Sequence, residues 1–290
     1  MTSVDTPAPA RQWIDGAPAP VSRVLYGLRP RLAEVVRVER LTPRMARVTL
    51  AGDFSELPGA AATDHVKVFF PSPGDELPVM PQVGEHGLVP PPPGTPRNYR
   101  DYTVRRLDRE AGELDLDMVV HAGGLAGAWA ASARPGLRVG VLGPRGSEVV
   151  DDSLDWYVLA GDETALPAIG RWLAELPAGA RAEVFCEVAD AAEEQELASA
   201  ADLTVHWLHR DGVPAGEATL LHDALAAMTP PAGRGFVWVA GEAGALRPVR
   251  RMLRAREDVC SRHLDVDGYW RRGVVNHDHH APGGDDGAPE

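Results

Sequence analysis

A short segment near residue 100 places a guanidinium, an aromatic ring and a hydroxyl close together. Arg100, Tyr102 and Thr103 fall within four positions at the start of an expected strand. A guanidinium neutralises pyrophosphate, a tyrosine ring can stack on a flavin, and the Thr103 hydroxyl or amide could reach the N5 edge of that ring. Thr103 is therefore our candidate catalytic residue. The alternative is an ordinary strand, because Tyr and Thr are common in strands.

A second segment carries glycines at the expected start of a helix. His121 is followed by Gly124, Ala126 and Gly127, and backbone N–H groups at a helix N-terminus bind phosphate. The segment is no dinucleotide fingerprint, since Ala122 stands where the first glycine of G-x-G-x-x-G would be. A plain glycine-rich turn and a structural histidine are the alternatives.

Two turns follow expected strands in the second half of the chain. One holds Gly161, Asp162, Glu163 and Thr164, and the other holds Gly241 and Glu242. Open α/β sheets bind nucleotides at the carboxyl ends of their strands, where a small residue lets the backbone approach a ligand. Both turns are thus candidate nucleotide contacts, with tight strand-to-helix turns as the alternative.

The elements that position the flavin-type segment have strand patterns. The expected strands are Glu34–Arg40, Met45–Ala51, His65–Phe70, Tyr102–Leu107, Glu113–His121 and Leu137–Leu142, with one helix at Leu125–Ala133. The Pro- and Gly-rich stretch Pro71–Asn98 is expected to be a long loop. Short strands joined by turns predict a small antiparallel β-barrel.

The second half alternates strands with helices. The strands are expected at Trp156–Ala160, Glu183–Val188, Leu203–His209 and Gly235–Ala240, and the helices at Leu166–Leu176, Ala218–Met228 and Leu246–Arg256. This alternation predicts a parallel sheet with crossover helices. We therefore expect a flexible tail at 1–22, a barrel domain at 23–150, an α/β domain at 151–273 and a flexible tail at 274–290.

Composition narrows the class of protein. The 290 residues, of which 44% are hydrophobic, fit two globular domains, and the net charge of −13 argues against nucleic-acid binding. The two cysteines, Cys186 and Cys260, exclude a disulfide scaffold and an iron–sulfur site. There is neither an apolar run long enough for a membrane span nor an apolar signal segment at the start, so we expect a cytoplasmic protein that does not bind membranes.

Four weaker signals have less specific interpretations. The histidines 277, 279 and 280 are interpreted as part of a flexible tail, so no metal site is expected. The acidic run Glu193–Glu196 is expected to be a solvated face, and Cys186 a core residue. Arg210, after an expected strand, is a weak candidate for a 2′-phosphate contact.

Taken together, these segments resemble the siderophore-interacting protein family, the flavin-dependent ferric-siderophore reductases. The resemblance covers roughly residues 30–273 and rests on DHVKVFFP, RDYTVR, HAGGLAGAW, GPRGS, LAGDETALPAI, VAGEA and GYWRRG. The family is a branch of the ferredoxin–NADP reductase superfold, with an antiparallel FAD-binding barrel followed by a parallel-sheet nicotinamide-binding domain. One departure concerns the usual G-P-A-S, which is replaced here by Gly124-Leu125-Ala126-Gly127. A phosphate-binding hydroxyl is lost, but the backbone amides remain, so we expect FAD binding to survive.

The resemblance implies both cofactors and their contacts. FAD would meet Arg100, Tyr102 and Thr103, with His121 and the Gly124–Gly127 turn near its pyrophosphate or adenosine. NADPH or NADH would meet the turns at 161–164 and 241–242. Electrons would then pass through FAD to Fe(III) held by a siderophore, which releases Fe(II). A general flavin reductase, a ferredoxin-linked carrier and a non-catalytic siderophore-binding protein are the alternatives.

The expected substrate sets a charge requirement. Many ferric siderophores are anionic, and a protein of net charge −13 repels them at long range. The resemblance implies a local basic patch beside the flavin, formed by Lys67, Arg145 and Arg271. Lys67 is the only lysine in the chain. We expect the protein to act as a monomer, with ferredoxin as a possible partner.

Overall fold

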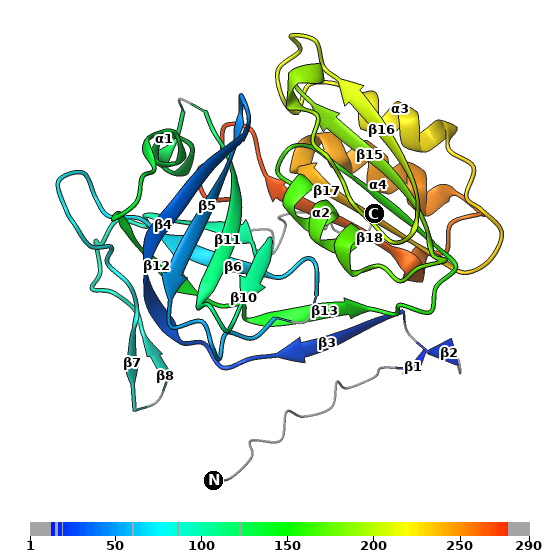
Figure 1. Cartoon of the computed structure of the whole chain (residues 1–290). Coiled ribbons are helices and arrows are strands. Elements are labelled where there is room, and N and C mark those ends of the chain that lie inside the picture. Colours follow the sequence, from blue (N-terminus) through cyan, green and yellow to red (C-terminus); the bar gives the residue numbers. More distant parts are fainter. Residues whose placement is uncertain are drawn as a thin grey trace.

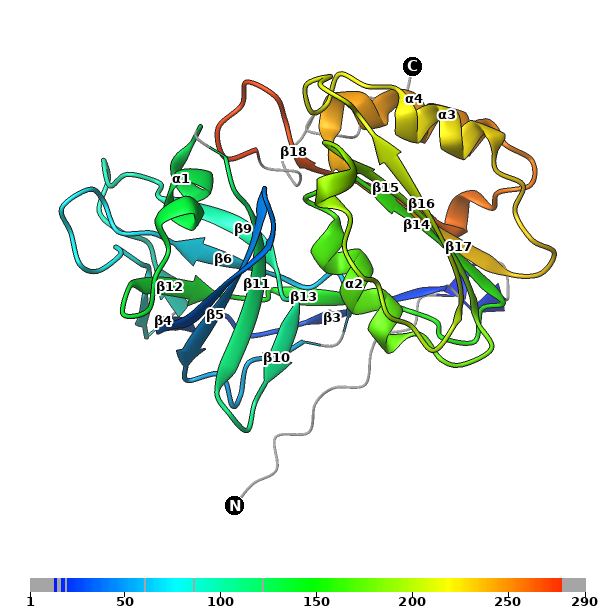
Figure 2. The ribbon, with the colours of Figure 1, turned by 45° about the horizontal axis from the view of Figure 1, so that its top comes forward.

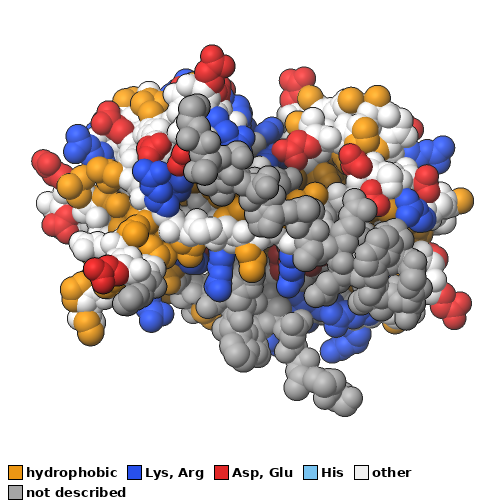
Figure 3. Space-filling view, turned by 90° about the horizontal axis from the view of Figure 1, so that it is seen from below, with side chains coloured by type: hydrophobic (Ala, Val, Ile, Leu, Met, Phe, Trp, Pro, Cys, Tyr) orange, Lys and Arg blue, Asp and Glu red, His pale blue; other side chains and the backbone are white. Residues whose placement is uncertain are grey.

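The computed structural model describes residues 13–14, 17–18, 20–59, 61–85, 87–121 and 123–277, which form two lobes side by side (Figure 1). The tails expected at 1–22 and 274–290 lie largely outside these residues, as do His279 and His280. On the face shown in Figure 3, the described residues of each lobe include both basic and acidic side chains.

The first lobe is a seven-stranded antiparallel sheet with the order β10-β11-β5-β4-β12-β6-β9. Its strands are β4 (Pro30–Thr42), β5 (Met45–Gly52), β6 (His65–Phe69), β9 (Tyr99–Thr103), β10 (Arg106–Asp108), β11 (Glu113–Val119) and β12 (Arg138–Leu142). The two edge strands, β9 and β10, are consecutive and separated only by Val104 and Arg105. Because so short a link spans about 10 Å at most, the sheet must curl until its edges meet, which closes the barrel.

Alternating apolar residues of these strands fill the barrel. Its core includes Val35, Val48, Leu50, Val66, Leu116, Met118 and Val139, all at most 1% exposed. The helix α1 (Leu125–Ser132) covers one end, where Trp129 packs on Phe70 with ring centroids 5.1 Å apart. Burial of this apolar surface is the main stabilising term of the domain.

The second lobe is a five-stranded parallel sheet with the order β16-β15-β14-β17-β18. Its strands are β14 (Trp156–Gly161), β15 (Arg181–Val188), β16 (Asp202–His209), β17 (Gly235–Glu242) and β18 (Leu264–Trp270). The helix α2 (Leu166–Glu175) packs on one face, and α3 (Leu220–Ala227) and α4 (Ala243–Ala255) pack on the other. The helix α2 is on the face turned towards the barrel (Figure 2).

The lobes share an apolar interface. Met45 and Ala62 of the barrel are buried within the same cluster as Ile169 and Trp172 of α2. A shared core of this kind holds the two lobes in one arrangement. Among the residues that the structure describes, no helix is long and apolar enough to cross a bilayer.

The structure departs from the expected elements in five places. The strands β3 (Val21–Leu25) and β13 (Gly146–Val150) pair with each other, and a short hairpin of β7 (Gln82–Gly84) and β8 (Gly87–Val89) lies within the expected loop. The small pair β1 (Trp13–Ile14) and β2 (Ala17–Pro18) precedes them. The expected continuous strand Tyr102–Leu107 is wrong, because the chain leaves one edge of the barrel at Thr103 and joins the other at Arg106. The strand β18 was not expected, since Asp265 and Asp267 interrupt its apolar pattern.

Candidate active site

The flavin-type segment forms β9, next to β6. Arg100 and Tyr102 pair with Val68 and Val66 of that neighbour. Arg100 is half-buried, donates through Nη1 to the Tyr99 carbonyl at 2.6 Å, and has no carboxylate of the described chain within ion-pair distance. Burial raises the pKa of Tyr102, so its phenol stays neutral. A cation with no anionic partner among the described residues, beside a neutral aromatic ring, fits the pyrophosphate and ring of a flavin dinucleotide.

Thr103, the candidate catalytic residue, lies differently. It is 6% exposed, and its side chain lies close to that of Tyr269 of β18. Tyr269 packs edge-on against Trp238, with ring centroids 6.1 Å apart. The residue therefore bridges the barrel and the α/β lobe, and its catalytic role stays a prediction.

The turn before α1 is open to a ligand. Gly124 is the N-cap of α1 with φ 79°, and no described side chain caps the helix. The first N–H groups of an α-helix have no partner within the helix and favour an anion. His121 is exposed, and its ring covers Gly127 so closely that a Cβ there would lie 2.3 Å from Cδ2. Ala126 faces the barrel core, so only its backbone could reach a ligand.

The two candidate nucleotide turns lie side by side at the carboxyl edge of the parallel sheet. Gly161 of β14 is in register with Ala240 of β17. From β14 the chain adds β15 and β16 on one side and β17 and β18 on the other. The order in which strands are added therefore reverses between β14 and β17. In open α/β sheets, the crevice at this point of reversal binds nucleotides.

The carboxylates of these turns accept hydrogen bonds from other groups of the protein. Asp162 accepts from the Thr164 amide at 2.9 Å, the Thr164 hydroxyl at 2.5 Å and Trp270 Nε1 at 2.8 Å. Burial and the neighbouring Glu163 raise the pKa of Asp162 to about 6. Glu242 accepts from the amides of Ala245 at 2.6 Å and Arg272 at 2.9 Å. These carboxylates hold the turns in shape, so a nucleotide would be met mainly by backbone groups.

The glycines of these turns are also needed for packing. A Cβ at Gly161 would lie 2.3 Å from both the Ala240 carbonyl oxygen and the Ala165 Cβ. Gly241 has φ 156°, and a Cβ there would lie 2.8 Å from an Asp162 oxygen. The sequence pattern predicts that these glycines let the backbone approach a ligand. In the structure, contacts within the protein already require glycine at both positions.

A buried cluster of ion pairs adjoins the Gly161–Thr164 turn. Arg210 pairs bidentately with Glu163 and lies 3.5 Å from Glu187, with its side chain 3% exposed. Burial raises the pKa of Glu187 to about 7, although Arg210 opposes this. The guanidinium is buried and already paired with the Glu163 carboxylate, which removes the support for a 2′-phosphate contact by Arg210.

The three candidate substrate residues differ in availability. Lys67 donates to both Asp101 oxygens at 2.9 Å and lies 5.1 Å from the Tyr99 ring centroid. Arg145 is exposed and forms no ion pair with any described residue. Arg271 is half-buried beyond the end of β18. Arg145 is thus the most available cation of the three.

Sequence reasoning missed one buried carboxylate. Glu193 was expected in a solvated face, but it is 2% exposed. It accepts from the Thr42 hydroxyl at 2.5 Å and the Arg44 amide at 3.3 Å, both from the β4–β5 turn of the barrel. The expectation is wrong because the burial comes from the other lobe. Cys186 is buried, as expected.

Comparison with known proteins agrees with this arrangement. The family model for the siderophore-interacting FAD-binding domain matches residues 34–148, and that for siderophore-interacting proteins matches residues 154–273. The chain belongs to the siderophore-interacting protein family. It is 32% identical to the ferric vibriobactin reductase ViuB of Vibrio cholerae, over 87% of this chain and 93% of that protein. It is also 32% identical to the NADPH-dependent ferric-chelate reductase of Escherichia coli, over 89% of this chain and 99% of that protein.

Solved structures give the same assignment. The siderophore utilization protein from T. fusca is 49% identical, with a TM-score of 0.84, over 90% of this chain and 100% of that chain. The ferredoxin reductase of carbazole 1,9a-dioxygenase is 15% identical, with a TM-score of 0.58, over 84% of this chain and 70% of that chain, which shows the shared fold alone. The predicted fold, an antiparallel flavin-binding barrel followed by a parallel-sheet α/β domain, is confirmed.

Proposed function

We propose that this protein is a ferric-siderophore reductase that uses NADPH or NADH and FAD. The observation that carries the proposal is the proximity of the Thr103 and Tyr269 side chains. It brings the end of the flavin-type strand next to β18, beside the carboxyl edge where nucleotides bind. The names of the relatives, a ferric vibriobactin reductase and an NADPH-dependent ferric-chelate reductase, support the same reaction.

The barrel residues fit FAD. Arg100 would neutralise the pyrophosphate, and the uncapped amides after Gly124 would bind phosphate oxygens. Tyr102, kept neutral by burial, would contact the ring, and Thr103 would hold the strand end near its N5 edge. FAD, when bound, accepts two electrons as a hydride and passes them on one at a time.

The α/β residues fit a reduced nicotinamide dinucleotide. The adjacent turns Gly161–Thr164 and Gly241–Glu242 would present backbone groups, while Asp162 and Glu242 keep the turns rigid. One NAD(P)H supplies two electrons, so each turnover reduces two siderophore-bound Fe(III) ions to Fe(II) and yields NAD(P)⁺ and one proton. Fe(II), with its lower charge, binds hard oxygen ligands less tightly and is released.

The substrate would meet a basic patch at Lys67, Arg145 and Arg271. No side chain is required as an acid or base on the iron complex, so the patch acts by position and charge. Both cofactor regions lie in one chain, so a monomer suffices. We place the reaction in the cytoplasm, where both reduced nicotinamides are available.

Stopped-flow spectroscopy of the purified, FAD-loaded protein tests this proposal. NADPH or NADH should bleach the flavin absorbance without oxygen, and a ferric siderophore should restore it. A protein that binds no FAD would contradict the flavoenzyme assignment. Bleaching by reduced ferredoxin and by neither nicotinamide would favour a ferredoxin-linked carrier. Reoxidation by free flavin and not by ferric siderophores would indicate a general flavin reductase.

A further inference from the structure

The link between β9 and β10 contacts the α/β lobe with three consecutive residues. Thr103 lies close to Tyr269, the Val104 carbonyl accepts from Arg171 Nη1 at 3.1 Å, and Arg105 lies against Gly170. Gly170 and Arg171 belong to α2. The end of the flavin-type strand is therefore docked on the helix that follows the Gly161–Thr164 turn.

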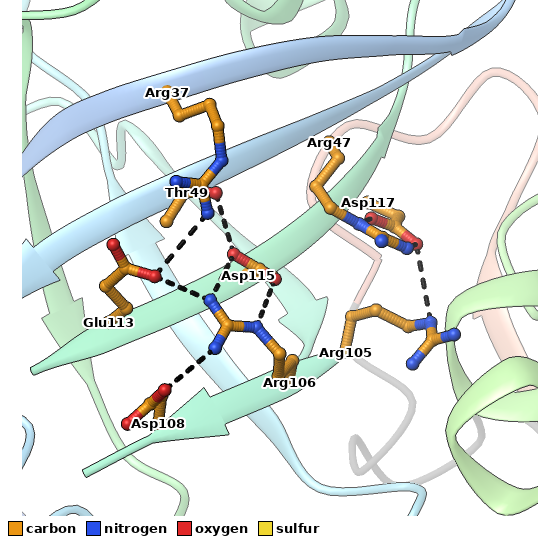
Figure 4. A network of polar contacts seen from close by, with 9 residues as sticks. All are labelled: Arg37, Arg47, Thr49, Arg105, Arg106, Asp108, Glu113, Asp115 and Asp117. Atoms are coloured by element: carbon orange, nitrogen blue, oxygen red, sulfur yellow. Dashed lines mark hydrogen bonds and ion pairs between the residues drawn. The ribbon is translucent and has the colours of Figure 1, made fainter. Parts of the chain in front are cut away.

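Arg105 is held in this position from the barrel side. Its Nε lies 3.6 Å from an Asp117 oxygen, and its amide donates to the Asp115 carbonyl at 3.0 Å. Asp117 is itself fixed by Arg47, whose Nε and Nη2 donate to it at 2.7 and 2.8 Å. The Arg105 guanidinium is directed away from the Arg106 network and towards α2 (Figure 4).

The opposite surface is shaped to receive it. A Cβ at Gly170 would lie 3.2 Å from both Nε and Nη2 of Arg105. Glycine in a helix interior is unfavourable relative to alanine, and α2 nevertheless carries one here. The missing side chain leaves room for the guanidinium.

We propose that Arg105 is a positioning residue, which sets the distance between the flavin-type strand and the nicotinamide turn by docking on Gly170 of α2. The inference rests on the proposed function. Hydride transfer requires the two reacting atoms within about 3.5 Å, and a misplacement of about 1 Å can cost a hundredfold in rate. A contact that fixes the two lobes therefore controls the first half-reaction and leaves the transfer to iron unaffected.

The variants Arg105→Ala and Gly170→Ala each change one of the two residues that form this contact. Gly170→Ala adds one methyl group against the guanidinium and at the same time favours the helix, so a loss of function there is not a loss of folding. Arg106→Ala is the matched control. Arg106 is the next residue and also an arginine, and it pairs with Asp108, Glu113 and Asp115, all of the barrel.

Stopped-flow measurements on the FAD-loaded variants give the kinetic test. At saturating NAD(P)H the rate of flavin reduction should fall roughly tenfold in Arg105→Ala and Gly170→Ala. It should change less than about twofold in Arg106→Ala, which loses only barrel ion pairs. FAD affinity, the KM for NAD(P)H and the rate of reoxidation by ferric siderophore should stay near wild type in all three. Arg105→Lys should keep part of the rate.

A distance measurement on the cofactor-free protein tests the same docking without catalysis. One spin label goes on the exposed Cys260 of the α/β lobe and one on Glu110→Cys, an exposed position of the barrel. The interlobe distance distribution should widen in Arg105→Ala and Gly170→Ala and stay narrow in Arg106→Ala.

Two outcomes would overturn the inference. One is wild-type flavin reduction with an unchanged distance distribution in both Arg105→Ala and Gly170→Ala. The other is an equal loss in Arg106→Ala, which would indicate a general effect of barrel charge. A wild-type protein that neither nicotinamide reduces would instead contradict the proposed function, and the distance distributions would still decide whether Arg105 docks the lobes.

Discussion

Two strand-to-helix turns of the candidate site, the one before α1 in the barrel and the one before α2 in the α/β lobe, are built in opposite ways. The turn before α1 is open, with an exposed His121 and an uncapped N-terminus at Gly124. The turn before α2 is closed, with Asp162 buried and bonded to Thr164 and Trp270. The barrel turn thus keeps its polar groups for a ligand, while the α/β turn uses its side chains internally and leaves backbone groups for the nucleotide.

Two glycines give the strongest test of this difference. A Cβ would meet another atom at 2.3 Å at Gly127 and at Gly161 alike. At Gly161 that atom belongs to the backbone of a buried strand, so Gly161→Ala should lower the free energy of unfolding by about 3 kcal/mol. At Gly127 it belongs to an exposed ring that can rotate away, so Gly127→Ala should stay within about 1 kcal/mol of wild type. Urea denaturation measures both, and equal losses would mean that the two turns are equally rigid.

The open turn and Arg100 should affect FAD rather than folding. Arg100→Ala should weaken FAD binding by about 1.5–3 kcal/mol, because charge-assisted hydrogen bonds to the pyrophosphate are lost. The melting temperature of the FAD-free protein should not change, since within the described part of the chain Arg100 bonds only to the neighbouring Tyr99 carbonyl. Fluorescence titration with FAD and a thermal melt check the two parts. Wild-type affinity in this variant would remove Arg100 from the flavin site.

The buried carboxylates should make the α/β lobe less stable as pH rises. The pKa values of Asp162, Glu187 and Asp265 are raised to about 6, 7 and 7, chiefly by burial. The folded state therefore holds protons that the unfolded state has lost, and its advantage, complete below about pH 4, disappears as pH rises through 6–7. The free energy of unfolding should therefore fall by several kcal/mol between pH 5 and pH 8.

The variant Asp162→Asn tests this assignment further, because it should reduce the slope of the free energy of unfolding against pH without abolishing that slope. The barrel provides the contrast. Although burial opposes it, hydrogen bonds from Arg106 and Thr49 hold the pKa of Asp115 below its usual range. The stability that Asp115 contributes is present above its unfolded pKa of about 4 and is lost only below it. A stability that rises from pH 5 to pH 8 would contradict the charge states assigned to the α/β lobe.

The smallest expected effect is a change in the KM for the ferric siderophore, which should differ between two basic residues of the substrate patch. Lys67 is already paired with Asp101, whereas Arg145 has no such partner among the described residues. Arg145→Ala should raise the KM for an anionic ferric siderophore about threefold to fivefold, and Lys67→Ala about twofold, as befits exposed charges. Added salt should reduce both differences. A larger effect at Lys67 would mean that the substrate displaces Asp101 from its ion pair.

Much of the fold follows from local sequence pattern. The repeat of strands and helices after residue 151 predicted β14 to β17 and α2 to α4, because apolar periodicity is set by the backbone of each element alone. The motifs also predicted which turns lie at the carboxyl edge of the sheet. The pairing of β3 with β13 could not be predicted in this way, since the two strands are about 120 residues apart and neither is strongly apolar.

The sequence by itself thus determined the two lobes, their order, and the segments that carry the candidate cofactor contacts. Only the tertiary structure decided what individual polar side chains do. Glu193 is buried by Thr42, 151 residues away, and Thr103 and Arg105 are committed to contacts with the other lobe. The physical reason is that periodicity depends on neighbours along the chain, whereas the environment of a charge depends on partners that only folding brings near.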